Sequence, residues 1–96
     1  MMVLITYDVN TESEGGKRRL RRVAKMCENF GQRVQNSVFE CLIDPVQLSD
    51  LRFRIEKEID KDRDSLRYYF LGANWQRRVE HVGAKKTYNP EGVIML

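Results

Sequence analysis

Three features of the 96-residue sequence predict an α+β fold. Segments with hydrophobic residues at every second position, as in strands, alternate with segments in which they recur every three or four positions, as in helices. The order is strand, helix, strand or strand pair, helix, strand and then short strands, and no repeat or low-complexity tract interrupts it. This order is typical of the ferredoxin-like βαββαβ fold, here with extra short C-terminal strands. We predict a single domain of this kind over residues 1–96.

The composition indicates one globular core. Hydrophobic residues make up 42% of the chain and charged residues 32%, which excludes an intrinsically disordered protein. A chain of 96 residues has room for one modest core and no second domain. The formal net charge is only +3, so the placement of the positive charges says more about partners than their excess does.

The sequence disfavours a zinc site. The two cysteines, Cys27 and Cys41, have no Cys-x-x-Cys spacing, and His81 is the only histidine. Each cysteine falls on the apolar face of its predicted element, so we expect buried thiols in a reducing compartment. Without a signal peptide or an apolar run long enough to span a membrane, the expected location is the cytoplasm.

The first predicted strand, residues 2–10, carries the candidate site. Val3, Ile5 and Tyr7 share one face, and the other face is also largely apolar, which is typical of a central strand covered on both sides. Asp8 follows at the carboxyl end of the strand, before a loop rich in turn-forming residues. An aspartate in this position either caps a turn or serves as a ligand at the sheet edge.

The segment 17–30 predicts the first helix, and Gly31 predicts its end. Six positively charged residues fall within nine positions of this helix, and its first acidic residue is Glu28. Such a surface is either solvated or in contact with phosphates, and the lack of acidic neighbours favours phosphates. The charged residues are Lys17, Arg18, Arg19, Arg21, Arg22 and Lys25.

Two elements follow this helix. Residues 32–43 are rich in strand formers, and Asn36 and Ser37 in their middle predict either a bent strand or a tight turn between two strands. Residues 44–47, Asp-Pro-Val-Gln, form a variant of the capping box with proline at the first helical position. A second helix is therefore expected from there to Ile59.

The last third of the chain predicts strands that need partners. A run of mixed charge at 60–64 is interpreted as a solvated loop. Residues 66–71 predict a strand with two apolar faces, and residues 79–82 predict a further short strand. The apolar end at 93–96 needs a sheet edge to pair with. Because helices cover only one face of this fold, we expect a homodimer with a sheet-on-sheet interface, and residues 87–96 as a tail that pairs there.

Asp8 offers an oxygen ligand of the kind that Mg²⁺ prefers, with Mn²⁺ as the second option. One carboxylate is a poor metal site, so a partner acid must come from Glu12, from Glu14 or from Asp8 of a second copy. A metal there would activate water for attack on a phosphodiester. Phosphate loops, nucleophile elbows and Cys–His pairs are absent from the sequence. Residues 75–78, Trp-Gln-Arg-Arg, and Lys85-Lys86 add cations, although Trp75 could instead pack a loop onto the core.

Four parts of the sequence carry a family resemblance. Besides the arginine-rich first helix, they are Tyr7-Asp8-Val9, Gln35-Asn36-Ser37-Val38-Phe39-Glu40 and Asp64-Ser65-Leu66-Arg67-Tyr68. Together they resemble the CRISPR-associated protein two family over nearly the whole chain. The resemblance implies a ferredoxin-like homodimer whose C-terminal strand adds to the partner's sheet, and work alongside the CRISPR integrase during the capture of new spacers. For some members it also implies metal-dependent cleavage of DNA or RNA.

By position, the resemblance assigns metal binding to Asp8 and places Tyr7 beside it, so we expect both in the catalytic site. Arg33, Ser37 and Phe39 match family residues close to the metal or to nucleic acid, although the strand pattern also makes Phe39 a core residue. The basic residues of the first helix match more loosely and are assigned to phosphate binding as a group. The expected nucleic-acid-binding residues are Lys17, Arg18, Arg19, Arg21, Arg22, Lys25, Arg33, Ser37, Phe39, Arg77 and Arg78.

Three functions fit the sequence. The first is a metal-dependent endonuclease that acts in spacer acquisition and antiviral defence, with duplex DNA as the favoured substrate and RNA as the second. The next is a non-catalytic dimeric scaffold that binds duplex DNA for the CRISPR integrase. A regulatory module for a small ligand is the third, and the sequence contains no polar pocket motif that would support it.

Overall fold

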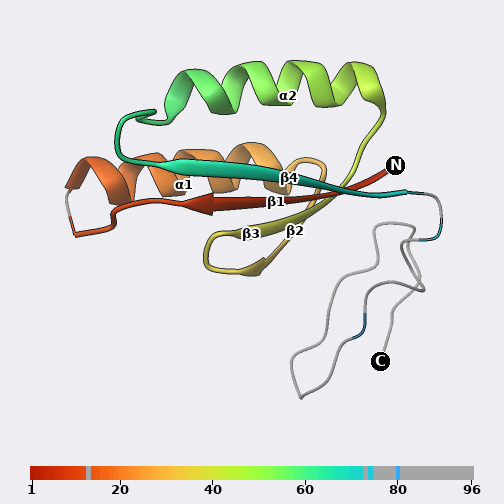
Figure 1. Ribbon diagram of the computed structural model, residues 1–96, viewed down its shortest axis with the longest axis horizontal. Helices are drawn as coiled ribbons and strands as arrows, with labels where there is room; N and C mark the ends of the chain where they lie inside the picture. Colours follow the sequence, from red (N-terminus) through yellow and green to blue (C-terminus); the bar gives the residue numbers. More distant parts are fainter. Residues whose placement is uncertain (13, 73, 75–79, 81–96) are drawn as a thin grey trace.

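The computed structural model describes residues 1–12, 14–72, 74 and 80 of the chain. Its elements follow the predicted βαββαβ order of an α+β, ferredoxin-like domain (Figure 1). The predicted short strand at 79–82 and the tail at 87–96 are not within the described residues. The elements are β1 (Met2–Asp8), α1 (Glu14–Glu28), β2 (Gly31–Gln35), β3 (Val38–Leu42), α2 (Pro45–Glu58) and β4 (Ser65–Gly72).

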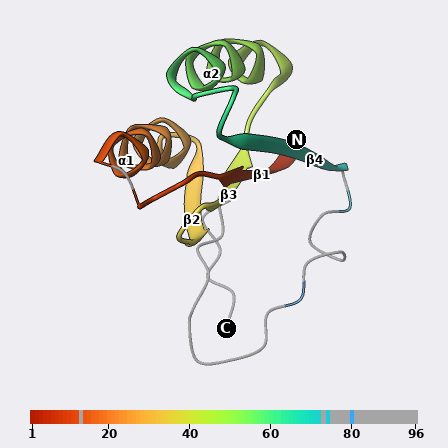
Figure 2. The ribbon, with the colours of Figure 1, turned by 60° about the vertical axis from the view of Figure 1, so that its left-hand side comes forward.

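The four strands form one sheet in the order β2-β3-β1-β4, in which every neighbouring pair is antiparallel. Strand β1 lies in the middle, with Thr6 opposite Val38 of β3 and opposite Arg67 of β4. Both helices pack on the same side of the sheet (Figures 1 and 2). The carboxyl end of β1 and the amino end of α1 therefore lie at the same end of the molecule (Figure 1).

The hydrophobic core lies between the sheet and the helices. Its β1 contribution comes from Val3, Ile5 and Tyr7, which alternate toward the helix side as the period of two predicts. On the other side Leu4 and Thr6 are only half-buried and Asp8 is exposed. The helices thus cover one face, and the homodimer expected to cover the second face stays a prediction. The remaining core residues are Leu20, Val23, Ala24, Cys27, Phe39, Cys41, Ile43, Leu48, Leu51 and Ile55.

Helix α1 begins and ends earlier than the sequence predicts. It starts at Glu14 and ends at Glu28, and Gly31 is already the first residue of β2. Gly31 has no positive φ, so it does not act as the predicted left-handed helix cap. A Cβ at this position would lie 1.8 Å from the carbonyl oxygen of Glu40 on the neighbouring strand. The glycine is required by the close approach of that strand rather than by the end of the helix.

The turn at Asn36 and Ser37 divides the next segment into β2 and β3, so the tight strand pair is the correct alternative. The capping box of α2 is also confirmed. The Asp44 side chain accepts a hydrogen bond from the Gln47 backbone N–H at 2.7 Å, and the Gln47 side chain accepts one from the Asp44 N–H at 3.1 Å. Pro45 occupies the first helical position, where its missing N–H costs no hydrogen bond.

Candidate functional site

Asp8 is the last residue of β1 and its side chain is exposed. Across the sheet it lies opposite Ser65, the first residue of β4. Within the described part of the chain, neither a hydrogen bond nor an ion pair engages its carboxylate, and no group of three or more His, Cys, Asp or Glu residues could hold a metal. Asp8 is therefore a carboxylate open to solvent, and the two candidate partner acids, Glu12 and Glu14, are exposed in the segment that follows it. This donor set fits a Mg²⁺ ion that completes its coordination with waters and substrate phosphate oxygens, rather than a closed protein site.

Tyr7, predicted as a catalytic neighbour of Asp8, points in the opposite direction. Its ring is buried in the core, and its hydroxyl donates a hydrogen bond to Asp64 Oδ2 at 2.5 Å. Burial, and secondly the neighbouring Asp64 carboxylate, raise the pKa of Tyr7 far above its usual value. In this structure the Tyr7 hydroxyl is therefore engaged with Asp64, and the residue fixes the end of β1. The expected catalytic role of Tyr7 stays a prediction.

Asp64 is the centre of a buried polar cluster that the sequence did not reveal. Besides the Tyr7 hydroxyl, it accepts hydrogen bonds from Arg19 Nε at 2.8 Å, from Arg19 Nη2 at 3.1 Å and from the Asp60 N–H at 3.0 Å. Its side chain is 0% exposed. Burial would raise the pKa of Asp64, but the bonds from Arg19, Tyr7 and Asp60 outweigh it and the pKa is lowered. We call Tyr7, Arg19, Asp60 and Asp64 the Asp64 cluster.

The Asp64 cluster corrects one interpretation. The run at 60–64 is not a uniformly solvated loop, because its last residue is an internal ion-pair partner. Arg19 differs from the other basic residues of α1, because its side chain is 17% exposed and two of its nitrogens donate to Asp64. Its expected contact with phosphate stays a prediction. Its position on the flank of the apolar stripe was the only sequence signal. Its partner lies 45 residues away in the chain.

Four of the basic residues on α1 form an exposed surface that we call the α1 basic face. Arg22 differs from them, because its Nη1 pairs with Glu58 Oε1 of α2 at 3.2 Å. The structure records no ion pair for the other four with any described residue. Since α1 begins at the end of the molecule where β1 ends, this face lies on the helix that directly follows Asp8 (Figure 1). The α1 basic face consists of Lys17, Arg18, Arg21 and Lys25.

The three candidates from β2 and β3 divide between core and turn. Phe39 is 0% exposed and packs on the helix side opposite Ile5, so it is a core residue, as the strand pattern predicts, and its place near nucleic acid stays an expectation from the family resemblance. Arg33 lies with its guanidinium carbon 5.9 Å from the centre of that ring, and its Nε donates to the Asn36 carbonyl at 2.7 Å. The Ser37 carbonyl accepts the Tyr7 N–H at 2.9 Å. The turn thus lies beside the end of β1, one residue from Asp8.

The last two predicted site residues cannot be placed relative to Asp8, and the two cysteines lie in the core. Arg77 and Arg78 lie outside the described residues. Cys27 and Cys41 are buried free thiols, as expected, and the Cys41 thiol lies 3.6 Å from the Cys27 carbonyl oxygen. In the described part of the chain, none of the helices is long and apolar enough to cross a membrane.

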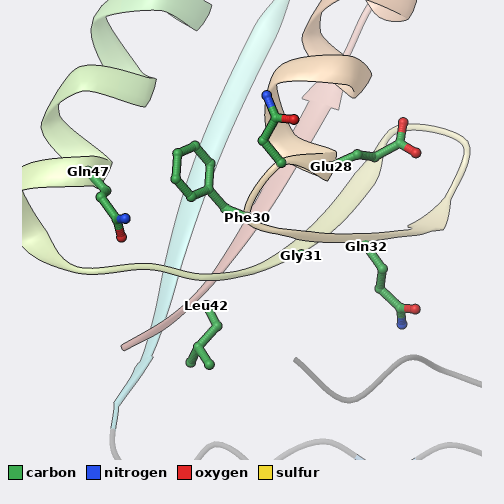
Figure 3. A pocket seen from close by; sticks show the side chains of 7 residues that line it. Glu28, Phe30, Gly31, Gln32, Leu42 and Gln47 are labelled. Atoms are coloured by element: carbon green, nitrogen blue, oxygen red, sulfur yellow. The ribbon is translucent and has the colours of Figure 1, made fainter. Parts of the chain in front are cut away.

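A polar hollow of about 580 Å³ opens where α1 leads into β2 (Figure 3). Leu42, one of its lining residues, lies opposite Met2 at the start of β1, so the hollow is at the far end of that strand from Asp8. None of the predicted site residues lines it. The lining residues are Glu28, Asn29, Phe30, Gly31, Gln32, Leu42 and Gln47.

Comparison with known proteins connects this arrangement to a family. Residues 1–79 match the family model described as CRISPR associated protein Cas2. A Chlorobaculum tepidum protein named CRISPR-associated endoribonuclease Cas2 is 60% identical over 96 residues, which is 100% of both chains. A Halalkalibacterium halodurans protein named CRISPR-associated endonuclease Cas2 is 57% identical over 95 residues, 99% of each chain.

The fold agrees with this similarity. The crystal structure of Streptococcus pyogenes Cas2 at pH 6.5 superimposes with a TM-score of 0.81 and 59% identity, over 86% of this chain and 100% of that one. Sequence, length and fold therefore point to the same group of CRISPR-associated nucleases. The chain belongs to the CRISPR-associated protein Cas2 family.

Proposed function

We propose that this protein is a Mg²⁺-dependent endonuclease that hydrolyses phosphodiester bonds and acts, as a homodimer, in CRISPR spacer acquisition. Duplex DNA is the favoured substrate and single-stranded RNA the second. Two similar proteins of nearly equal identity are named an endoribonuclease and an endonuclease, so relatedness alone does not choose between the substrates. The observation that carries the proposal is the exposed Asp8 carboxylate at the end of β1, on the strand that leads toward the α1 basic face.

In this proposal each group has one role. Asp8 binds the metal ion, which supplies Lewis acidity and lowers the pKa of a bound water when it is present. The α1 basic face binds backbone phosphates of the nucleic acid and holds the substrate next to the end of β1. The Asp64 cluster has a structural role, because it fixes Tyr7 and hence the backbone directly before Asp8. A second copy of the chain supplies the second Asp8 that a single chain lacks.

The proposal predicts that Asp8→Asn abolishes cleavage without affecting the fold. The amide keeps the size of the side chain but loses the negative charge that binds the ion, so we expect a loss of at least about 100-fold in rate. Duplex DNA and single-stranded RNA are incubated with the wild type and the variant, each with Mg²⁺ or with EDTA. Because Asp8 is exposed, the variant should keep the wild-type unfolding midpoint. Cleavage by a well-purified Asp8→Asn protein at the wild-type rate would refute the proposal.

A second function has its own supporting observation. The α1 basic face carries four cations with no ion pair among the described residues, whereas no group of three or more potential metal ligands lies among the same residues. Such a surface suits a non-catalytic scaffold that holds duplex DNA for the CRISPR integrase. In that case Asp8→Asn leaves spacer acquisition intact in cells. Removal of the charges of the α1 basic face abolishes it.

A further inference from the structure

The antiparallel pairing of β1 with β4 brings a cation to the Asp8 side of the sheet. Asp8 lies opposite Ser65, and Thr6 lies opposite Arg67. Residues paired across antiparallel strands project from the same face, and alternate residues of a strand share that face. Asp8, Ser65 and Arg67 therefore all project from the face that the helices leave uncovered. Arg67 is the diagonal neighbour of Asp8, about 7–8 Å away between backbones, a distance that a long side chain can span.

The arginine is placed beside the carboxylate without being bound to it. Its Nη1 donates a hydrogen bond of 3.4 Å to the hydroxyl of Tyr69, which lies two residues further along β4. That hydroxyl, and to a lesser degree the negative charge of Asp8, raise the pKa of Arg67. Among the described residues Arg67 takes part in no ion pair within 4.0 Å. An exposed carboxylate and an exposed guanidinium thus project from the open face of the sheet, at diagonal positions of two neighbouring strands.

We propose that Arg67 is a further catalytic residue, which binds the scissile phosphate in the space beside Asp8. This inference rests on the nuclease function proposed above and identifies a residue that binds the phosphate to be cleaved. The planar guanidinium has donors in a fork that matches two phosphate oxygens. From one side of the site, Asp8 contributes the negative charge that attracts the metal ion. Arg67 contributes from the other side the donors that meet the non-bridging oxygens.

The assigned reaction is hydrolysis, and its atoms balance without any co-reactant besides water. The water oxygen forms a new bond to phosphorus, the bond from phosphorus to one ester oxygen breaks, and that oxygen leaves with a proton from the water. One phosphate monoester and one hydroxyl end result. Negative charge grows on the phosphoryl oxygens in the transition state, so a guanidinium already placed beside them lowers the barrier.

The opposite charges of Asp8 and Arg67 also affect which ligands bind. A guanidinium close to Asp8 repels a divalent cation that arrives alone, but it attracts a phosphate that arrives with one. The site therefore favours the ion and the phosphodiester together over the ion by itself.

The test compares Arg67→Ala and Arg67→Lys with Arg54→Ala. Arg54 lies on α2, away from the sheet face, and its exposed side chain pairs with Asp50 at 3.1 Å. Arg54→Ala therefore changes the net charge by as much as Arg67→Ala does, but at a different place. Single-turnover cleavage of duplex DNA at saturating protein should fall by about 100-fold in Arg67→Ala, as on loss of one donor to a developing oxyanion. Arg67→Lys should recover part of the rate, since it keeps the charge and loses the fork. Arg54→Ala should cleave as the wild type does.

A second readout does not depend on activity. Mn²⁺ alone is titrated into the nucleic-acid-free protein and followed by its electron paramagnetic resonance signal. With the repelling cation removed, Arg67→Ala should bind Mn²⁺ about two- to fivefold more tightly than the wild type. Arg54→Ala should bind it with unchanged affinity. Because Arg67 is exposed on an edge strand, both variants should keep the wild-type unfolding midpoint.

The outcomes separate this inference from the function on which it rests. Wild-type protein that does not cleave, or Asp8→Asn protein that cleaves equally well, overturns both. Asp8-dependent cleavage with a wild-type saturated rate in Arg67→Ala overturns the role of Arg67 alone. The same holds if only the protein concentration at half-maximal rate changes, or if Mn²⁺ binds no more tightly. If Arg67→Ala does not fold, Arg67→Lys becomes the deciding variant. A wild-type cleavage rate in Arg67→Lys would count against the role of the forked guanidinium donors.

Discussion

Asp64 shows how one buried carboxylate can connect three parts of the chain. It accepts hydrogen bonds from β1 through Tyr7, from α1 through Arg19 and from its own loop through Asp60. With its side chain fully buried, removal of the carboxylate leaves a guanidinium and a hydroxyl without partners. Through Tyr7, Asp64 therefore holds the backbone directly before Asp8.

We predict that Asp64→Ala lowers the free energy of unfolding by about 3–5 kcal/mol at pH 7, the usual cost of breaking a buried ion pair on one side. Since the pKa of Asp64 is lowered in the folded state, its contribution is complete at pH values above about 5 and is lost as the pH falls below about 4. Urea unfolding at several pH values should show the difference from wild type narrowing in acid. Asp62→Ala, in the same loop but exposed, serves as the control. Equal stability of the two variants, or a difference independent of pH, would contradict this role.

The orientation of a side chain was predictable from the sequence where the alternation along its strand decides it. The alternation along β1 correctly separates the exposed Asp8 from the buried Ile5, and the same rule makes Phe39 a core residue. The assignment of Phe39 to nucleic acid came from family position alone and stays a prediction. Arg19 and Asp64 could not be paired in advance, because 45 residues separate them and each looks like an ordinary surface charge.

Helix α1 illustrates the same limit for an element. Its apolar stripe is clear in the sequence, but its start at Glu14 is not, because Gly15 and Gly16 are poor helix formers. Gly16 is buried, so tertiary packing decides the first turn against local propensity. The start of α2 was predictable, since a capping box is entirely local and residues 44–47 contain all of it.

The α1 basic face leads to a prediction for the whole helix. Replacement of Arg18 and Arg21 together by alanine should weaken duplex DNA binding and reduce the slope of log affinity against log salt by about 2, because each arginine that neutralises a phosphate contributes about one unit. The matched control is Arg54→Ala with Arg63→Ala, which removes two exposed arginines that already pair with Asp50 and Asp60. Affinity is measured by fluorescence anisotropy over a salt series. Equal losses in both double variants would mean that net charge, and not this face, holds the DNA.

At the scale of the whole molecule, the open face of the sheet is the feature that indicates a second copy. Leu4, Val38 and Leu42 are only half-buried on it, and Tyr69 is 43% exposed. Apolar side chains at the centre of a sheet face are normally covered. A two-fold contact between two such faces would also bring two copies of the Asp8 edge toward one axis. The dimer therefore stays the prediction on which a metal site with two carboxylates depends.

The cleavage rate of mixed dimers tests most directly whether two Asp8 carboxylates form one catalytic site. Wild-type and Asp8→Asn chains are refolded together in equal amounts, and the rate with Mg²⁺ is compared with that of each pure protein. If both Asp8 carboxylates serve one site, only dimers with two wild-type chains cleave, and random pairing gives about one quarter of the wild-type rate. A rate of about one half would show that each chain cleaves by itself, and a rate equal to that of the wild type would show that Asp8 takes no part.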